Sequence, residues 1–579
     1  MKKIIIAAFM AMALLATSCK DFLDCPPSAV LSDAQVQGAG AIDCLIVAAY
    51  ASLANDYWNR PLNMWCFMEV GSDNAYKGGG SLSDQGNINY IEQHEAVQPN
   101  NGYYNNMWTF LYLCINRCNA ALTQLVAVDA SAYPMKEQRI AEMKFLRAQF
   151  YWRLLVLMND IVWVDETMDT DAINAATNYD YTPAQIWDKI YQDCADAYNV
   201  LPETQNELAR PTKYAAAAAA AKMAFLSSTK LDQTTWAWQG VDQDKMAKVL
   251  QWTDIVMKSG KYALHDDIGT NFYPEGDNGK ESIWAIQYSH DDGTMYGRGN
   301  FSNGLNWPVK INGCDFYKPS VNLINAYRTE DGIPMFDTFN VHEKYGKDTF
   351  KPTDLGKVDP RVFHTVAMPT VAFKMVYDTS VENNNIYNYD WMRDPADYFI
   401  FSSLRQLMPT TSETINWIVP YLGCTLNQAE YRYDDILLMR AEALIETGKW
   451  QEAKALVNQI RSRAAQSTTY FQDPRFGVPL ENLECRPYTD AEWASEEFAR
   501  KALHFERRLE LATEGCRFWD LVRWGEVETV MNKYYAEEQQ YAPYLKNAKF
   551  DTAADTFDPV PLNQISLSKG AYKQHGQYK

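Results

Sequence analysis

The feature that most constrains this chain is a stretch near its C-terminus, residues 489–525, where apolar and charged side chains recur at helical spacing. Thr489 and Glu492, three residues apart, form the pattern of a capping box at a helix start. Gly515 fits the left-handed position beyond a helix end, and a shorter helix follows it. The apolar faces of the two expected helices are Phe498, Ala502, Phe505 and Leu509, and Phe518, Leu521, Val522 and Trp524. We therefore expect two helices that each pack one face into a core.

The same two helices carry a high density of charge: Arg507, Arg508, Glu510, Glu514, Arg517, Asp520 and Arg523. Arg507 with Glu510, and Asp520 with Arg523, are three residues apart, so each pair can meet on one helix face. One interpretation makes Glu510 and Asp520 a catalytic carboxylate pair. The other makes the charges a network that joins the two helices. We favour the network, because an arginine beside each acid lowers the pKa of that acid away from general-acid work.

The N-terminus has the pattern of an export signal over residues 1–18. Lys2 and Lys3 precede an apolar run over 4–15, and small residues lead to Cys19. A cysteine in that place resembles the cleavage site of a bacterial lipoprotein, with Cys19 as the lipidated first residue; an ordinary secretory signal before a chance cysteine is the alternative. Residues 20–24, KDFLD, resemble the signal that sends such lipoproteins to the outer face of the cell. No other run approaches the ~18 apolar residues of a membrane helix, so we expect a lipid anchor and no membrane-spanning segment.

Charge and cysteine content exclude several classes of function. Lys and Arg total 53 against 73 Asp and Glu, a net charge of −20. That balance argues against nucleic acid as a partner and weakly favours neutral ligands. Eleven cysteines include Cys19, no CxxC pair occurs, and the seven histidines lie far apart, so we predict free thiols and neither a metal nor a cofactor. Acidic spacing at 165–171 and 277–279 could hold calcium, but without a complete twelve-residue loop a solvated turn is the better interpretation.

We expect residues 19–32 to form an extended tether and residues 33–579 to form one domain, with an N-terminal part of about 33–270 and a C-terminal part of about 271–579. The periodicity of ESIWAIQY predicts a strand over 281–288. Helices are predicted over 39–55, 108–125, 134–157, 181–201, 213–226 and 244–259, and a helical hairpin over 434–464. The fold class is predicted to be all-α, with tetratricopeptide-like helical hairpins as scaffold, a loop-rich face and minor β-strands.

Two segments carry a resemblance to a known family: ERRLELATEGCRFWDLVRWG at 506–525 and RYDDILLMRAEALIETGKWQEAKALVNQIRSRA at 432–464. Both are similar to signatures of the SusD/RagB family, surface glycan-binding lipoproteins of the outer membrane of Bacteroidetes. The resemblance implies a SusD-like fold without enzymatic activity. It also implies that the chain captures an oligosaccharide or polysaccharide at the cell surface and delivers it to a SusC-like TonB-dependent transporter for uptake. The alternatives are a surface glycoside hydrolase on an α-helical scaffold and a structural helical-repeat subunit.

The predicted glycan site lies in two long polar loops that contain aromatic residues, 72–106 and 289–312. The resemblance implies ligand contacts in these regions, but no motif there matches the family residue by residue, so we choose residues by composition. Aromatic rings cover the apolar C–H face of a sugar, and polar side chains bond its hydroxyls. The expected contacts are Tyr76, Tyr296 and Trp307 for stacking, and Asp73 and Asn74 for hydrogen bonds. The alternative for Trp307 is a packed corner of the core.

Overall fold

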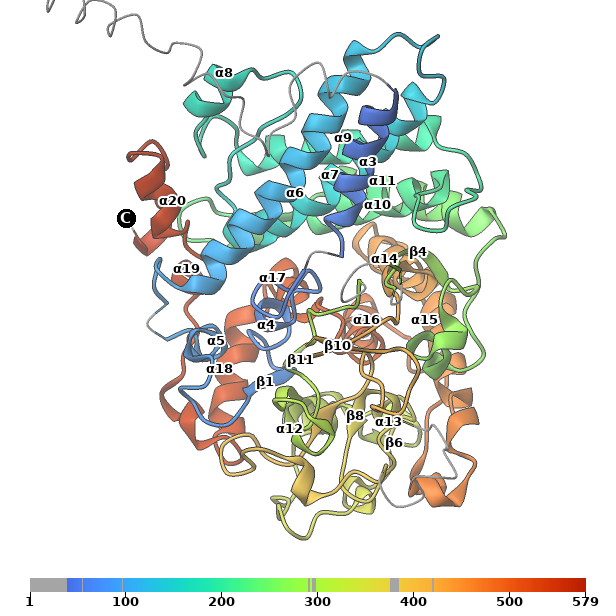
Figure 1. Cartoon of the computed structure of the whole chain (residues 1–579). Helices are drawn as coiled ribbons and strands as arrows, with labels where there is room; N and C mark the ends of the chain where they lie inside the picture. The colour runs from blue at the N-terminus through green and yellow to red at the C-terminus, as the bar shows by residue number, and fades with distance from the viewer. Residues whose placement is uncertain are drawn as a thin grey trace, which may run out of the picture.

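The computed structural model describes residues 39–54, 56–95, 97–289, 292–293, 298–374, 385–418 and 421–578. The predicted signal 1–18, the lipidation site Cys19, the tether 19–32 and the candidate ring Tyr296 lie outside these residues. Figure 1 shows long helices from the N-terminal part of the chain, blue to green, stacked in its upper half. Its lower, loop-rich half holds loops, short strands and helices from the C-terminal part, orange to red. None of the helices that the structure describes is both long and apolar enough to cross a membrane.

The α-helices vary from one turn to seven turns in length. They are α3 (Ala39–Ala51), α4 (Trp65–Met68), α5 (Gly86–Gln93), α6 (Gly102–Ala127), α7 (Lys136–Met158), α8 (Thr170–Ala175), α9 (Pro183–Val200), α10 (Lys213–Leu226), α11 (Gln243–Lys258), α12 (Val321–Ala326), α13 (Val362–Thr365), α14 (Tyr433–Glu446), α15 (Trp450–Gln466), α16 (Glu496–Glu510), α17 (Arg517–Trp524), α18 (Val527–Glu538), α19 (Thr552–Asp555) and α20 (Leu562–Leu567).

The strands are short and pair two by two, in antiparallel fashion. The pairs are β1 (Ala75–Gly78) with β5 (Phe316–Pro319), β2 (Thr229–Leu231) with β3 (Trp238–Val241), β4 (Ser282–Ile286) with β12 (Gln428–Arg432), β6 (Thr329–Glu330) with β7 (Ile333–Pro334), β8 (Val366–Ala367) with β9 (Ser402–Ser403), and β10 (Ile415–Ile418) with β11 (Tyr421–Cys424).

The fold class predicted from the sequence is confirmed, and the predicted N-terminal helices are all present as α3, α6, α7, α9, α10 and α11. The start of α9 shows why the prediction succeeds. The Thr182 hydroxyl accepts a bond from the Gln185 amide at 3.3 Å, and the Gln185 side chain accepts one from the Thr182 amide at 2.8 Å. Local side chains thus satisfy the free amides of the first turn.

Successive helices pack against one another in one continuous stack: α6 on α7, α7 on α9, α9 on α10, α10 on α11, α11 on α14, α14 on α15, and α15 on α16. Residues 259–432, which hold most of the short strands, leave this stack after α11 and return to it at α14. Small side chains allow close approach at α10, where the seven alanines 215–221 are all fully buried between α9 and α11. The stack therefore joins helices from both parts of the chain.

Helix α7 is buried on nearly every side, so its charged side chains need partners inside the protein. Arg147 donates two bonds of 3.0 Å to Asp193 of α9. Arg153 donates to Glu430 of β12 at 2.7 Å and to the carbonyl of Leu62 at 2.8 Å. The bonds of Arg147 join two helices of the stack, and those of Arg153 tie the middle of the stack to the loop-rich half.

The predicted hairpin at 434–464 is confirmed as α14 and α15. Gly448 adopts the left-handed conformation, with φ of 79°, that reverses the chain between the two helices. The apolar residues on the facing sides are buried in a small core shared with α16: Leu437, Ala441, Leu444, Ile445, Ala453, Val457 and Ile460.

Two local predictions are wrong. The sequence predicts one long loop over 72–106, but this segment contains β1, α5 and the start of α6, because its polar side chains find partners inside the protein. Thr489 and Glu492 do exchange the expected bonds, at 3.3 and 2.8 Å. The turn that they cap does not continue into the helix, however. Helix α16 starts at Glu496, and the hydroxyl of Ser495 accepts the bond from the Phe498 amide at 3.1 Å.

Buried ion pairs gather where α16 meets α14, α15 and the loop-rich half. This arginine network joins the guanidinium groups of Arg361, Arg405, Arg432, Arg461 and Arg463 to the carboxyl groups of Glu281, Asp359, Asp434, Glu506, Glu510 and Glu514. Five arginines thus face six acids. Three of the acids, Glu281, Asp434 and Glu510, bring oxygens within 4.8 Å of one another.

The network has one acid more than it has arginines, and one bound proton balances the excess negative charge. Burial raises the pKa of Asp434 well above its usual range, as do Glu281 and Glu510 beside it, and Arg432 does not offset them. Burial would also raise the pKa of Glu510, but Arg463 and Arg361 lower it below its usual range. Asp434 is therefore protonated and bonds to Glu510, which leaves five carboxylates for five guanidinium groups. The network is electrically neutral with its own residues.

Arg361→Ala should strongly destabilise the protein. Arg361 donates to Asp359 at 2.7 and 2.9 Å and to Glu510 at 2.8 Å, and pairs with Glu506 at 2.7 Å. Its removal leaves buried carboxylates without a counter-charge, which costs about 3–5 kcal/mol. Chemical unfolding of the two proteins measures this loss in the free energy of unfolding.

The matched control is Arg475→Ala, which removes an arginine whose ion pair with Asp473 is exposed to solvent. Screening by water makes such pairs contribute little. If the two substitutions lowered stability equally, the buried network would not have the structural role assigned to it.

Candidate functional site

Tyr76, a predicted stacking ring, lies in β1 and has no exposed surface. Its hydroxyl donates to the Glu538 carboxyl group of α18 and accepts a bond from the Val321 amide at 3.2 Å. A ring without exposed surface cannot stack on a sugar, so the structure contradicts this assignment. Tyr76 instead joins β1 to α12 and α18.

Asp73 and Asn74, the predicted hydrogen-bonding residues, are also buried. Arg517 donates to Asp73 at 2.7 and 2.9 Å, and Arg508 pairs with it at 3.0 Å. Burial alone would raise the pKa of Asp73, but the two arginines lower it below its usual range. Asn74 accepts a bond from Arg508 at 2.9 Å and donates to Glu69 at 2.9 Å. Both side chains are thus used to hold β1 against α16 and α17, and the assignment to ligand is wrong.

Trp307 has no exposed surface either, and its indole N–H donates to the Met408 carbonyl at 2.8 Å. Gly313 passes so close that a Cβ there would lie 1.8 Å from the Trp307 carbonyl oxygen. The alternative given for this residue, a packed corner of the core, is therefore confirmed. Of the predicted ring residues, only Tyr296 stays untested, because it lies outside the described residues.

An aromatic patch of three half-buried rings, Tyr57, Trp58 and Tyr421, lies where the turn at 56–60 meets the β10–β11 hairpin. The Trp58 and Tyr421 ring centroids are 5.8 Å apart, and each is 5.9 Å from that of Tyr57. Two buried rings support the patch: Phe301 is 6.4 Å from Tyr57, and Tyr103 is 6.3 Å from Trp58. The three rings are thus held in place from below while part of each remains exposed, an arrangement that suits stacking on a sugar.

Polar groups without a partner surround this patch. Four buried atoms make no hydrogen bond to any described residue: Asp56 Oδ1, Trp58 Nε1, Arg60 Nε and Asn300 Oδ1. Each such atom costs about 1–3 kcal/mol unless water or a ligand satisfies it. Three of the four atoms belong to the turn at 56–60, so ordered waters are expected beside the patch.

Tyr57 and Trp58 were not among the residues predicted to contact the glycan, although they carry the same signal that was used for Tyr76. They stand among Asn55, Asp56 and Asn59 and follow a helix. Tyr421 has no comparable signal, because only the hairpin register places it beside them. Trp417 of the same hairpin is 46% exposed. It pairs with Leu422, so it lies on the opposite face from Tyr421.

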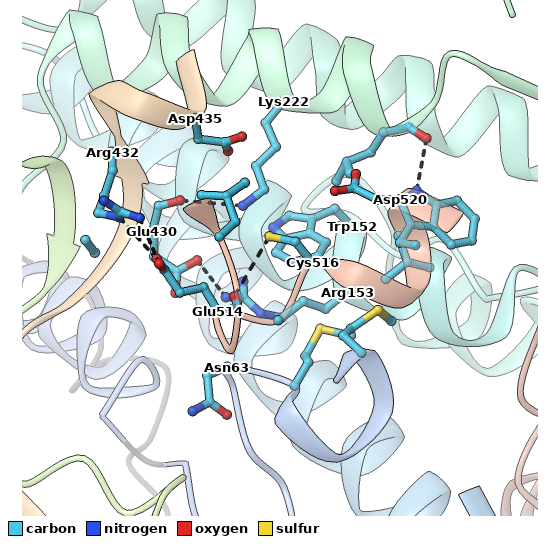
Figure 2. A pocket seen from close by; sticks show the side chains of 18 of the residues that line it. Asn63, Trp152, Arg153, Lys222, Glu430, Arg432, Asp435, Glu514, Cys516 and Asp520 are labelled. Carbon is cyan, nitrogen blue, oxygen red and sulfur yellow. Dashed lines mark hydrogen bonds and ion pairs between the residues drawn. The ribbon is translucent and has the colours of Figure 1, made fainter. Parts of the chain in front are cut away.

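A cavity of about 80 Å³ lies beneath α10 and α17, between the helical stack and the loop-rich half (Figure 2). Ion pairs form part of its wall: Arg153 donates to Glu430 at 2.7 Å, and Arg432 donates to Glu514 at 2.8 and 3.1 Å. At ~15 Å³ for each water, this space holds about five waters. It is too small for a sugar ring, so we do not assign the glycan site to it.

Glu510 and Asp520, the alternative catalytic pair, both belong to ion-pair networks. Asp520 accepts bonds from Arg507 at 3.0 and 3.3 Å and from Arg523 at 2.7 Å. Burial would raise its pKa, but the two arginines lower it, as Arg463 and Arg361 do for Glu510. Neither acid holds a proton to donate near neutral pH, so the predicted charge network is confirmed. The expected contact of Arg507 with Glu510 is replaced by that of Arg507 with Asp520.

Comparison with known proteins agrees with this architecture along the whole described chain. The sequence model of the SusD family matches residues 280–578, slightly more than half of the chain. A second model, described as starch-binding associating with outer membrane, matches residues 21–225. The chain belongs to the SusD family, as the resemblance of its C-terminal segments indicated.

Individual relatives are distant but match over nearly their full length. SusD-like protein P25 of Formosa agariphila is 20% identical over 560 residues, which cover 95% of this chain and 94% of the relative. A SusD-like protein of Bacteroides fragilis superposes with a TM-score of 0.68 at 18% identity, covering 96% of this chain and all of that one. Surface glycan-binding protein A of Bacteroides thetaiotaomicron, in complex with laminarihexaose, gives a TM-score of 0.63 at 19% identity and covers 93% and 100%.

Buried acids predict that the protein is most stable at mildly acidic pH. Burial raises the pKa of Asp56 and Asp558 from 3.8 to about 7 and that of Glu538 from 4.5 to about 7. From about pH 4 to pH 7 the folded chain therefore binds more protons than the unfolded chain, so stability falls as pH rises. His94, His265, His342 and Lys374 act in the opposite sense, because burial lowers the pKa of each. The acids outweigh them, because burial also raises the pKa of Glu92 and Asp555 to about 7. Calorimetry should show a melting temperature that is higher at pH 5 than at pH 8.

The variant Asp56→Asn provides the control for this trend. The amide oxygen of the new side chain can still accept hydrogen bonds from the Ser302 hydroxyl and from the Tyr288 hydroxyl, which lies 3.4 Å from the oxygen in the wild type. The substitution removes the proton that titrates. The melting temperature of this variant should fall less between pH 5 and pH 8. A wild-type melting temperature that rises over this interval would contradict the assignment of these acids.

Proposed function

We propose that this chain binds an oligosaccharide or polysaccharide at the cell surface, without cleaving it, and delivers it to a SusC-like TonB-dependent transporter of the outer membrane. Membership of the SusD family supports the proposal, as does the match of residues 21–225 to a family described as starch-binding associating with outer membrane. The bound laminarihexaose of one structural neighbour supports a glycan as the ligand class.

The observation that carries the proposal for this chain is the aromatic patch. A sugar ring has an apolar C–H face, and Tyr57, Trp58 and Tyr421 expose parts of three rings at fixed separations. The unpartnered atoms of Asp56 and Asn300 lie beside them. Ordered waters that bridge to ligand hydroxyls can supply the missing bonds.

A glycoside hydrolase is less well supported. Such an enzyme needs one carboxyl group that carries a proton and a second at a distance of ~5–10 Å, both open to substrate. Asp56, whose pKa is raised to about 7, is the acid beside the patch. It is 4% exposed, and its other oxygen accepts a bond from Ser302. The acids Glu510 and Asp520 are held by arginines.

Binding should occur without hydrolysis. Soluble chain beginning at Lys20 is run on affinity gels that contain laminarin, starch or other neutral polysaccharides, and release of reducing sugar is assayed in parallel. We expect retardation on at least one gel and no release. Combining Trp58→Ala with Tyr421→Ala should weaken this binding about a hundredfold, because each stacking ring contributes roughly tenfold.

The matched control for the double variant is Tyr179→Ala, which removes a 54% exposed tyrosine from the surface of the helical stack. It should bind as the wild type does. A folded double variant that binds normally would refute the patch as the site, and release of reducing sugar by the wild type would favour the hydrolase.

We also propose that the chain is held at the membrane by lipid on Cys19. This part of the proposal rests on the N-terminal sequence. Cys19→Ala should yield uncleaved precursor or soluble protein, because no thiol is left to carry the lipid. Membrane fractionation measures this, and protease added to intact cells should digest the wild-type protein. Mature, membrane-bound Cys19→Ala protein would contradict lipidation, and protection of the wild type from protease would contradict exposure at the cell surface.

A further inference from the structure

A second groove, of about 540 Å³, lies on a different set of elements from the aromatic patch. Trp238 of β3 forms one side, Gly525 after α17 forms another, and Glu528 and Thr529 of α18 and Thr552 of α19 complete it. We call it the Trp238 groove. Its volume is within the range of small-molecule sites, about 300–1,000 Å³. None of the residues of the aromatic patch, Tyr57, Trp58 and Tyr421, lines this groove.

Trp238 is exposed but held in a fixed orientation. Its side chain is 44% exposed, and its indole N–H donates to the Arg523 carbonyl, at the end of α17, at 2.8 Å. Gly525 lies directly against the ring. A Cβ there would come within 2.7 Å of Trp238 Cγ, and the backbone has a positive φ of 71°. A ring fixed in this way loses little conformational freedom when a ligand stacks on it.

The opposite side of the groove offers free oxygen atoms. One carboxylate oxygen of Glu528 accepts bonds from the Thr552 hydroxyl at 2.5 Å and from the Thr552 amide at 3.3 Å. The other oxygen of Glu528 and the hydroxyl of exposed Thr529 make no hydrogen bond to the residues that the structure describes. A carboxylate accepts bonds from ligand hydroxyls, and a threonine hydroxyl both donates and accepts.

The charge of the lining limits the class of ligand. Glu528 is the one ionisable side chain among the lining residues, and no lysine or arginine is among them. An anionic ligand would be repelled by Glu528 and would find no cation. The groove beside Phe336 and Phe505 differs, because basic and acidic side chains line it and pair with one another, as Lys501 does with Asp337. The Trp238 groove therefore suits a neutral ligand that is rich in hydroxyl groups.

We propose that the Trp238 groove is a second saccharide site, in which a neutral sugar stacks on Trp238 and its hydroxyls bond to Glu528 and Thr529. The assignment rests on the proposed function in taking a neutral glycan as the ligand class, but not on the aromatic patch as its site. Two sites on one chain would hold a polysaccharide more tightly than either alone, because the second contact forms at high effective concentration.

The test uses ¹⁹F NMR of chain beginning at Lys20 that carries 5-fluorotryptophan. The Trp238 resonance is identified by its absence from Trp238→Phe. Laminarihexaose and maltohexaose are titrated into the wild type and into the patch variant that combines Trp58→Ala with Tyr421→Ala. We expect at least one of the sugars to move the Trp238 resonance in both proteins. The resonance of Trp417, which is equally exposed at 46% but lines no groove described here, serves as the internal control and should not move.

Thr529→Arg supplies the blocking variant. Position 529 is exposed on α18 and arginine is a good helix former, so the variant should fold while its side chain fills the groove. It should weaken the apparent affinity measured at Trp238 at least tenfold and leave the patch unaffected. The melting temperature of each variant verifies that it is folded.

The outcomes separate this site from the proposed function. A Trp238 resonance that no neutral sugar moves, or that moves only when the patch is intact, overturns the second site. A shift that persists at full strength in Thr529→Arg also overturns it, because the groove would not be responsible. A shift in both proteins, with unchanged retention of the patch variant on affinity gels, supports the second site and refutes the patch.

Discussion

The buried pairing of arginine with carboxylate around α16 is the interaction on which the rest of the structure depends. The arginine network joins residues that are distant in the sequence, Glu281, Arg361, Arg432, Arg463 and Glu510. A second set, Asp73 with Arg508 and Arg517, continues it to β1. A buried charge is costly unless its partner is in place, so these segments can come together in few other ways. We infer that the network selects the arrangement of segments, while the apolar cores of the helical stack supply most of the stability.

This arrangement determines where a ligand can bind. The helices of the stack pack continuously from α6 to α16, and residues 259–432 form a long excursion from it. In polar loops close to the network, such as 72–74, the side chains are paired inside the protein and do not reach a ligand. Exposed rings that the scaffold supports lie farther out, among them those in the turn at 56–60 with β11 and in β3 beside α17. Both candidate sites combine a ring held by the scaffold with polar atoms that the protein does not pair.

The outcome for the predicted residues follows from the same physics. Tyr76, Asp73 and Asn74 were selected because their neighbours are polar, and polar neighbours usually indicate an exposed loop. Here the neighbours are polar because buried arginines and Glu538 need partners. Composition alone cannot tell a solvated polar loop from a buried, internally paired one, since both contain the same residue types. Tyr57 and Trp58 had the same composition signal and a different environment.

The sequence by itself determined the long N-terminal helices, the 434–464 hairpin, the charge network of α16 and α17, and the family. These features depend on periodicity, caps and contacts within a few residues, which local order specifies directly. Only the tertiary structure decided which acid meets which arginine, that the stack continues from α11 to α14, and which aromatic rings remain exposed. Exposure and pairing of a side chain depend on segments hundreds of residues away, as Tyr421 beside Trp58 and Arg508 beside Asp73 show. No local pattern records those contacts.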